Sequence, residues 1–225
     1  MSELILALDL PAEEARRLLD RIPEAKWVKV GSILFASEGP ALVRELTRRG
    51  LKVFLDLKWH DIPNTVAGAV ESARALGVSM ATVHSLGGRA MMEAAARAAG
   101  GDLGLVGVTV LTSHTADSYG RAVGRAGVVV MEEVGRLAHE ALGAGLRGIV
   151  CSPLEVGAVR AAGGPDAWIV VPGIRRPGDA AGDQARTATP ADAVRSGATH
   201  LVVGRPVLQA DDPRAVFLEM LAAAS

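Results

Sequence analysis

The sequence predicts an α/β fold, a (β/α)8 or TIM barrel that forms a single domain over residues 1–225. Three observations support this prediction. Short apolar runs recur eight times along the chain, and segments with helical periodicity or helix-capping residues lie between them. The length of 225 residues is typical of eight strand–helix units.

The expected strands are near-continuous apolar runs, as in a parallel sheet covered by helices. We place them at residues 4–8, 27–31, 53–57, 80–84, 104–111, 148–151, 168–171 and 199–204. Apolar residues at helical spacing predict helices over 11–22, 40–49, 62–76, 89–99 and 132–142. Three later helices are predicted from their capping residues, at Ser152-Pro153, Thr189-Pro190 and Asp212-Pro213. Gly50, Gly77 and Gly145 are typical of helix ends.

A doubly wound open sheet is the alternative fold. Its dinucleotide-binding members carry a glycine-rich fingerprint after the first strand, whereas Asp9-Leu10-Pro11 stands there in this chain. No linker, low-complexity segment or run of charges divides the sequence. A single barrel therefore remains the prediction.

Composition excludes several classes of function. The formal charge of −1 and the 3% of aromatic residues predict no surface for nucleic acid, and no apolar stretch reaches membrane-spanning length. The first residues lack the features of a signal peptide. A single cysteine, Cys151, excludes an internal disulfide and is expected in the core, so we expect a reduced, cytoplasmic setting. The histidines show no metal-ligand spacing with carboxylates, and we expect no metal.

The strongest chemical signal is the stretch that begins at Asp56 and reads Asp-Leu-Lys-Trp-His-Asp-Ile-Pro-Asn-Thr. Residues two apart on a strand point to the same side, so Asp56 and Lys58 face one way, and Asp61 follows near the turn at Ile62-Pro63. A lysine held between carboxylates stays protonated and can donate a proton or stabilise a developing carbanion. An ordinary ion pair at a strand end is the structural alternative.

Lysine usage favours the chemical interpretation. Only four lysines occur, at positions 26, 29, 52 and 58, among 24 lysines and arginines. Arginine keeps its proton at ordinary pH, whereas lysine can release it. Lys29 and Lys58 fall toward strand ends, and Lys26 and Lys52 fall near strand starts, where a solvated surface role is expected.

Barrel active sites lie at the carboxyl ends of the strands, and several polar residues are predicted there. They are Asp9, Lys29, Asp56, Lys58, His84, Thr112 and Arg205. Strands seven and eight are followed by Pro172-Gly173-Ile174-Arg175 and Gly204-Arg205-Pro206. Glycine admits close approach of the backbone to an anion and arginine offers a fork of donors, so these loops predict a phosphate site.

Two longer segments are predicted to be functional loops. Residues 173–188 are polar and contain glycine, and we expect a lid over the phosphate with Gln184 bridging ligand groups. Residues 112–127, with Ser113, His114 and Ser118, are expected to clamp the other end of the ligand, while Tyr119 packs.

These motifs together resemble the orotidine 5′-monophosphate decarboxylase family of bacterial type. The central stretch from Asp56 to Thr65 carries the resemblance, which extends over the whole chain. Further matching segments are Ala7-Leu8-Asp9, Lys29-Val30-Gly31, Leu111-Thr112-Ser113, Pro172-Gly173-Ile174-Arg175, Asp183-Gln184, Ala188-Thr189-Pro190 and Val203-Gly204-Arg205-Pro206. Trp59 stands where the family usually has another aromatic or an aliphatic residue.

The resemblance implies the last step of de novo pyrimidine synthesis, in which orotidine 5′-monophosphate becomes uridine 5′-monophosphate and carbon dioxide without a cofactor. It implies a network of Lys29, Asp56, Lys58 and Asp61, in which Lys58 protonates C6 of the pyrimidine. The implied substrate-binding residues are Asp9 and Lys29 at the ribose, Thr112 at the base, Gln184 between base and phosphate, Arg175, Gly204 and Arg205 at the phosphate, and also Pro172 and Thr65. It further implies a homodimer in which Asp61 and Thr65 reach across the interface.

Two other functions are compatible with parts of this pattern. Magnesium-dependent sugar-phosphate decarboxylases or aldolases of the same barrel superfamily, such as the 3-keto-gulonate-6-phosphate decarboxylases, share an Asp-x-Lys-x-x-Asp core. The Ile62-Pro63-Asn64-Thr65 continuation and Gln184 favour the pyrimidine enzyme. A barrel that binds a nucleotide without turnover would be expected to have lost a charged residue of the core, and none is lost.

Overall fold

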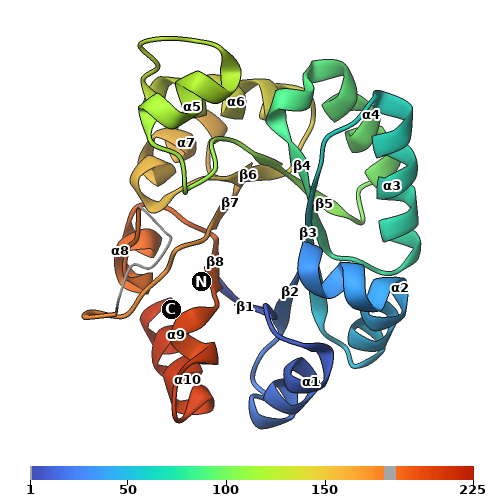
Figure 1. Ribbon diagram of the computed structural model, residues 1–225, viewed down its shortest axis with the longest axis vertical. Helices are drawn as coiled ribbons and strands as arrows, with labels where there is room; N and C mark the ends of the chain where they lie inside the picture. The colour runs from blue at the N-terminus through green and yellow to red at the C-terminus, as the bar shows by residue number, and fades with distance from the viewer. Residues whose placement is uncertain (1, 180–185) are drawn as a thin grey trace.

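The computed structural model describes residues 2–179 and 186–225, and it is a closed barrel of eight parallel strands (Figure 1). The strands are β1 (Glu3–Ala7), β2 (Trp27–Gly31), β3 (Lys52–Trp59), β4 (Met80–His84), β5 (Gly104–Val108), β6 (Gly148–Val150), β7 (Trp168–Val171) and β8 (His200–Val203). Each strand pairs in parallel with the next, and β8 pairs with β1 from Glu3↔His200 to Leu6↔Val203, which closes the barrel. The predicted fold class is confirmed.

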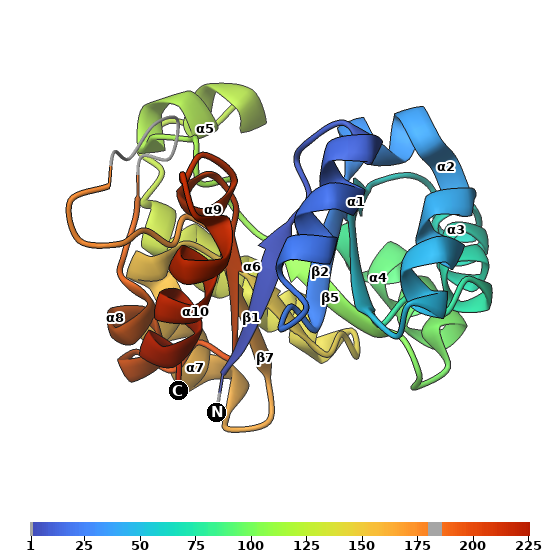
Figure 2. The ribbon, with the colours of Figure 1, turned by 90° about the horizontal axis from the view of Figure 1, so that it is seen from below.

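Helices surround the strands on the outside of the barrel (Figure 1). They are α1 (Ala12–Arg21), α2 (Ser32–Arg48), α3 (Pro63–Ala75), α4 (Arg89–Ala99), α5 (Ala116–Val123), α6 (Val130–Gly143), α7 (Val156–Gly163), α8 (Pro190–Arg195), α9 (Arg205–Leu208) and α10 (Pro213–Ala223), with short 3-10 turns η1 (Ser85–Gly87) and η2 (Pro153–Glu155). Figure 2 shows both chain termini at one end of the barrel, while α5 and α9 lie at the other end, to which β1 points.

The core has two layers because side chains alternate in direction along each strand. Leu4 and Leu6 of β1 pack outward in the large cluster between strands and helices, whereas Ile5 and Ala7 pack inside the barrel. The inner cluster is completed by Trp27, Phe54, Met80, Val106, Val170 and Val202, with Val150 and Trp168 against it. The interior of the barrel is therefore filled by packed side chains along the described strands.

Two helical segments were not predicted. The span α2 consists of two helices joined across a kink at Gly39 (φ 62°), so the helix expected from Pro40 is present and the segment before Gly39, which begins at Ser32, was missed. A helix, α5, also stands within the predicted loop 112–127. Its start is a capping box in which Thr115 and Ser118 satisfy each other's backbone N–H groups, a signal that sequence inspection overlooked.

Two strand ends also differ from prediction. β5 ends at Val108 rather than at residue 111, and β3 continues past residue 57 to Trp59. The second difference matters for the site, because it places Lys58 inside the strand. Tyr119 of α5 is buried as predicted, and its hydroxyl donates a hydrogen bond to Glu133 of α6 at 3.2 Å.

Candidate active site

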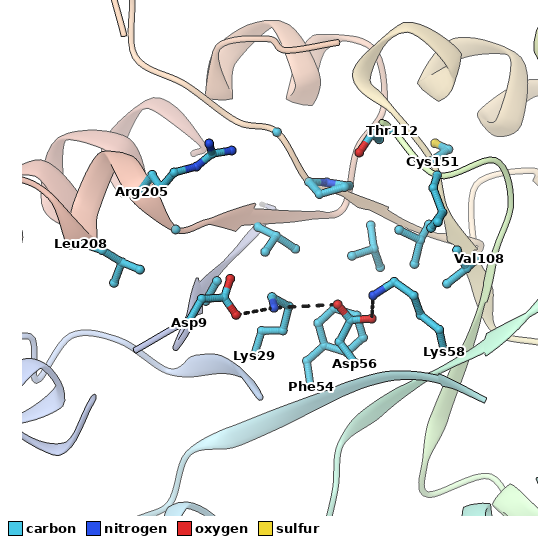
Figure 3. A pocket seen from close by; sticks show the side chains of 18 of the residues that line it. Asp9, Lys29, Phe54, Asp56, Lys58, Val108, Thr112, Cys151, Arg205 and Leu208 are labelled. Carbon is cyan, nitrogen blue, oxygen red and sulfur yellow. Dashed lines mark hydrogen bonds and ion pairs between the residues drawn. The ribbon is translucent and has the colours of Figure 1, made fainter. Parts of the chain in front are cut away.

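A cavity of about 550 Å³ opens at the carboxyl ends of the strands (Figure 3). Its polar lining consists of Asp9, Lys29, Asp56, Lys58, Thr112, Arg175, Arg205 and Gln209. Its apolar lining includes Phe54, Val108, Val110, Val150, Cys151, Val170 and Val202. Charged groups thus stand on an apolar floor, which is the usual make-up of a small-molecule site.

Four charged side chains form a row along one wall of this cavity (Figure 3). The Lys29 ammonium lies 3.0 Å from Asp9 Oδ1 and 3.8 Å from Asp56 Oδ2. The Lys58 ammonium lies 2.8 Å from Asp56 Oδ1. Signs therefore alternate from Asp9 to Lys58, and the Lys29 and Asp56 side chains in the middle are only 11% and 14% exposed.

Glycine leaves room next to this row. A Cβ at Gly31 would lie 3.1 Å from Lys29 Nζ and 3.4 Å from Asp9 Oδ1. Any larger residue at the end of β2 would press on the Lys29–Asp9 ion pair. Gly31 therefore leaves the space in which the two charged groups meet.

Lys58 has an unusual backbone conformation. Its φ of 51° is the one positive value among the described residues other than glycine. The pairing of β3 with β4 runs normally to Leu55↔Ala81 and resumes at Trp59↔Val83, so β3 carries extra residues between them. Bulges of this kind redirect side chains beside active sites, and strained backbone is often found there.

Two arginines also line the cavity. Arg175 follows β7 and is buried, and Arg205 begins α9 after β8. Both also line a second hollow of about 360 Å³ with Arg176 and Asp179. Figure 3 shows Arg205 and Lys58 on opposite sides of the cavity, so its two ends carry separate cationic groups.

A buried ion pair joins three loops behind the cavity. Arg186 precedes α8, and its guanidinium pairs with Glu155 of η2, with side chains 11% and 2% exposed. The same guanidinium donates to the Leu111 carbonyl at 3.3 Å, next to Thr112. Glu155 in turn accepts the Ser152 N–H at 2.6 Å, beside Cys151. The loops after β5, β6 and β7 are thereby connected through one arginine.

Cys151 and two histidines border the site without joining the charged row. Cys151 is buried, as predicted, and also lines the cavity, and its burial raises the pKa of its thiol. Burial also lowers the pKa of His84 to about 4, helped by nearby His60 and Lys58. The His84 and His60 rings stack with centroids 5.6 Å apart, and neither residue lines the cavity.

Among residues 2–179 and 186–225, no three His, Cys, Asp or Glu side chains are placed to hold a metal ion. The helices of the described residues are all too short or too polar to cross a bilayer.

Comparisons with known proteins agree with this geometry. The family model described as "Orotidine 5'-phosphate decarboxylase / HUMPS family" matches residues 2–220. The chain belongs to this family. The orotidine 5'-phosphate decarboxylase of Alkalilimnicola ehrlichii is 55% identical over 97% of this chain and 94% of its own length. That of Anaeromyxobacter sp. strain K is 56% identical over 93% and 92%.

A solved structure supports the same assignment. The crystal structure of orotidine 5'-phosphate decarboxylase from Lactobacillus acidophilus has a TM-score of 0.89 and 36% identity, and the match covers all of both chains. The resemblance inferred from the sequence is therefore confirmed, and the comparisons identify an enzyme of the orotidine 5'-phosphate decarboxylase type.

Most of the residues that the family resemblance implied lie together in this structure. Those that line the cavity are Asp9, Lys29, Asp56, Lys58, Thr112, Pro172, Arg175, Gly204 and Arg205. Asp61 and Thr65 do not line it: both are exposed, and Asp61 accepts the Ile62 N–H at 2.6 Å. Gln184, together with residues 180–185 of the predicted lid, lies outside the described residues.

Sequence inspection missed other groups of this family member's site. The apolar floor gave no separate signal, because inward-facing valines look the same whether they fill a core or line a cavity. Gln209, which lines the cavity after α9, carried no motif. Arg186 and Glu155 are 31 residues apart, and nothing local predicts their pairing.

Proposed function

We propose that this chain decarboxylates orotidine 5′-monophosphate to uridine 5′-monophosphate and carbon dioxide, the last step of de novo uridine monophosphate synthesis. The observation that carries the proposal is the cavity with Asp56 and Lys58 on one side and Arg205 on the other. Arg175 lines the same cavity and shares a second hollow with Arg205. Such a cavity fits a substrate with a carboxylated ring at one end and a phosphate at the other. The chain's family membership supports the same substrate.

In the proposed reaction, Lys58 is the acid. The bond between C6 and the carboxyl carbon breaks, its electron pair stays on C6, and the Lys58 ammonium supplies the proton that completes the C6–H bond. An ammonium fixed beside C6 stabilises negative charge as it develops, at low reorganisation cost. Its 2.8 Å contact with Asp56 supports this role, because the carboxylate holds the ammonium in place.

The remaining cavity residues are proposed to bind the substrate. Lys29 and Asp9 hold the ribose hydroxyls, Thr112 contacts the base, and Gln184 links base and phosphate. Arg175, Gly204 and Arg205 hold the phosphate, and Pro172 also contacts the substrate. Phosphate binding far from C6 can be used to organise the reacting end, which raises kcat as well as affinity. No cofactor enters this mechanism.

We further propose that the enzyme is a cytoplasmic homodimer in which Asp61 and Thr65 complete the partner's site. The support is their exposure together with that of nearby apolar side chains. Ile62 is 67% exposed before α3, and Ile33 is 85% exposed near the start of α2. Ile62 follows Asp61 directly in the chain, and exposed apolar side chains that form one patch are typical of a contact surface.

Ultraviolet absorbance tests the reaction directly. The purified chain is mixed with orotidine 5′-monophosphate in the presence of EDTA, with Lys58→Ala in parallel. Rapid formation of uridine 5′-monophosphate by the wild type alone is expected. No conversion by folded wild type would overturn the proposal, and turnover of a sugar phosphate that requires magnesium would favour the alternative family activity.

Subunit exchange tests the shared site. Lys58→Ala and Asp61→Ala dimers are each expected to be inactive. Mixing them produces hybrids with one intact site, so partial activity should return. No recovery, with exchange verified by mass spectrometry of tagged subunits, would contradict a role for Asp61 across the interface.

A further inference from the structure

Thr82 of β4 lies behind the charged row and contacts both of its reactive members. It is fully buried and does not line the cavity. Its hydroxyl accepts the Lys58 backbone N–H at 2.8 Å and donates to Asp56 Oδ1 at 3.1 Å. That same oxygen accepts the Lys58 ammonium at 2.8 Å. One hydroxyl thus closes a ring that contains the backbone of Lys58, its ammonium and the Asp56 carboxylate.

The bulge in β3 explains why a side chain is needed here. Regular pairing between β3 and β4 is interrupted between Leu55 and Trp59. A buried N–H without an acceptor costs about 1–3 kcal/mol, so the Lys58 N–H requires a substitute for its partner in the sheet. The Thr82 hydroxyl is that substitute, and it holds Lys58 in its positive-φ conformation.

We propose that Thr82 is a positioning residue for catalysis, which sets the direction of the Lys58 ammonium and the Asp56 carboxylate toward the reacting end of the substrate. This inference rests on the proposed function. Threonine suits the task because its branched Cβ restricts χ1, so the hydroxyl has one preferred direction. Serine offers the same two hydrogen bonds with a less restricted hydroxyl, whereas valine keeps the shape and offers none.

The expected consequence is a loss in kcat with little change in KM. Thr82 of β4 contacts Lys58 and Asp56, whereas Arg175 and Arg205 follow β7 and β8. Binding of the phosphate end should therefore persist without the Thr82 hydroxyl. A displaced acid, in contrast, slows proton transfer, and a misplacement of about 1 Å can cost about 100-fold. We expect kcat of Thr82→Val to fall by about 10- to 100-fold and KM to change by less than about 3-fold.

Thr109 offers a matched control. Thr109 is also a fully buried threonine and directly follows β5, the strand that pairs with β4. Its hydroxyl donates to the Val150 carbonyl at 3.0 Å and does not contact the charged row. Thr109→Val should lower the melting temperature and leave kcat unchanged. Thr82→Ser should retain kcat within about 5-fold of the wild type, because both hydrogen bonds can re-form.

The experiment compares kcat, KM and melting temperature for wild type, Thr82→Val, Thr82→Ser and Thr109→Val, with circular dichroism to verify folding. Amide hydrogen exchange at Lys58 adds a readout that does not depend on turnover, and exchange should be faster in Thr82→Val than in the wild type. If Thr82→Val does not fold, Thr82→Ala removes the same hydroxyl, and its kcat and KM are compared with those of Thr82→Ser.

Several results would overturn the inference. They are an unchanged kcat in Thr82→Val, an equal loss in Thr109→Val, a loss in Thr82→Ser as large as in Thr82→Val, or unchanged exchange at Lys58. Failure of the proposed function is a different result, since wild-type protein would then leave orotidine 5′-monophosphate unconverted. The exchange measurement still tests the role of Thr82 at Lys58 in that case.

Discussion

The two ends of the barrel use the same strands for opposite purposes. At the carboxyl end, the strands carry Asp56 and Lys58 beside a cavity. At the amino end, Trp27, Trp168 and His200 close the barrel, with ring centroids 4.9 to 6.5 Å apart. Lys52 and Arg147 lie over the two indole rings at 5.2 and 5.0 Å. Cations at this end lie over aromatic faces, whereas those at the other end face a cavity.

The difference predicts that substitutions at the amino end change stability, whereas substitutions at the carboxyl end change activity. Substitutions among the tightly packed rings should change the free energy of unfolding with little effect on kcat or KM. Substitutions in the charged row should do the reverse, since partly buried charges and the strained backbone at Lys58 are tolerated there for function.

The largest expected effect is the loss of activity in Lys58→Ala. Removal of the acid and of the stabilising charge should lower kcat/KM for orotidine 5′-monophosphate by at least about 10³-fold, while the melting temperature changes little. Lys52→Ala, at the start of the same strand, is the matched control and should keep full activity. A comparable loss of kcat/KM in both variants would contradict the proposed difference between the two ends of β3.

Arg186→Met tests a region where stability and substrate binding should change together. Loss of the guanidinium leaves Glu155 as a buried, unpaired carboxylate, so the free energy of unfolding should fall by about 3–5 kcal/mol. KM should rise as well, because Arg186 connects the loops that carry Thr112 and Cys151. Urea unfolding and steady-state kinetics measure the two effects.

The double variant Arg186→Met with Glu155→Gln provides the control for that experiment. It removes the uncompensated charge and should recover part of the stability but not the KM. Full recovery of both would mean that the ion pair does not position the loops.

Substitution of the glycines around Trp168 should change stability alone, without an effect on KM. A Cβ at Gly148 would lie 2.1 Å from the Trp168 carbonyl oxygen, and one at Gly104 would lie 2.2 Å from its ring. Either alanine substitution should destabilise the fold by about 1–3 kcal/mol with KM unchanged. Gly135→Ala, on α6 with open space around its Cβ, should instead be neutral or stabilise by up to about 1 kcal/mol.

The smallest expected effect is a pH dependence at the amino end. Burial lowers the pKa of His200 to about 4, with a further contribution from Lys52. Because the unfolded imidazole has its ordinary pKa near 6.5, the unfolded state binds more protons between these values. Stability that is present above pH 6.5 is therefore lost as the pH falls toward 4.

A His200→Gln variant isolates this contribution. Between pH 7 and pH 5 the wild type should lose about 1–2 kcal/mol more of its free energy of unfolding than the variant does. His84 at the other end titrates in the same direction and remains in both proteins, so it cancels in the comparison. Equal pH dependence, measured by urea unfolding, would assign the effect to other groups.

Local patterns were enough for much of this molecule. The eight apolar runs, the residues at their carboxyl ends and the motif from Asp56 onward could be recognised because period, polarity and spacing are properties of neighbouring residues. The overlooked α5 carried a capping box at Thr115 and Ser118, which is also a local signal. Its polar surroundings led to the prediction of a loop.

The sequence by itself therefore determined the barrel, the family and most of the cavity's charged residues. Only the tertiary structure decided how Lys58 is aimed, through a bulge in β3 and the hydroxyl of Thr82, and which arginine joins the loops behind the cavity. It also decided that Trp27, Trp168 and His200 meet at the amino end. The physical reason is the same in each case: these contacts join residues far apart in the chain, and their geometry depends on strand register.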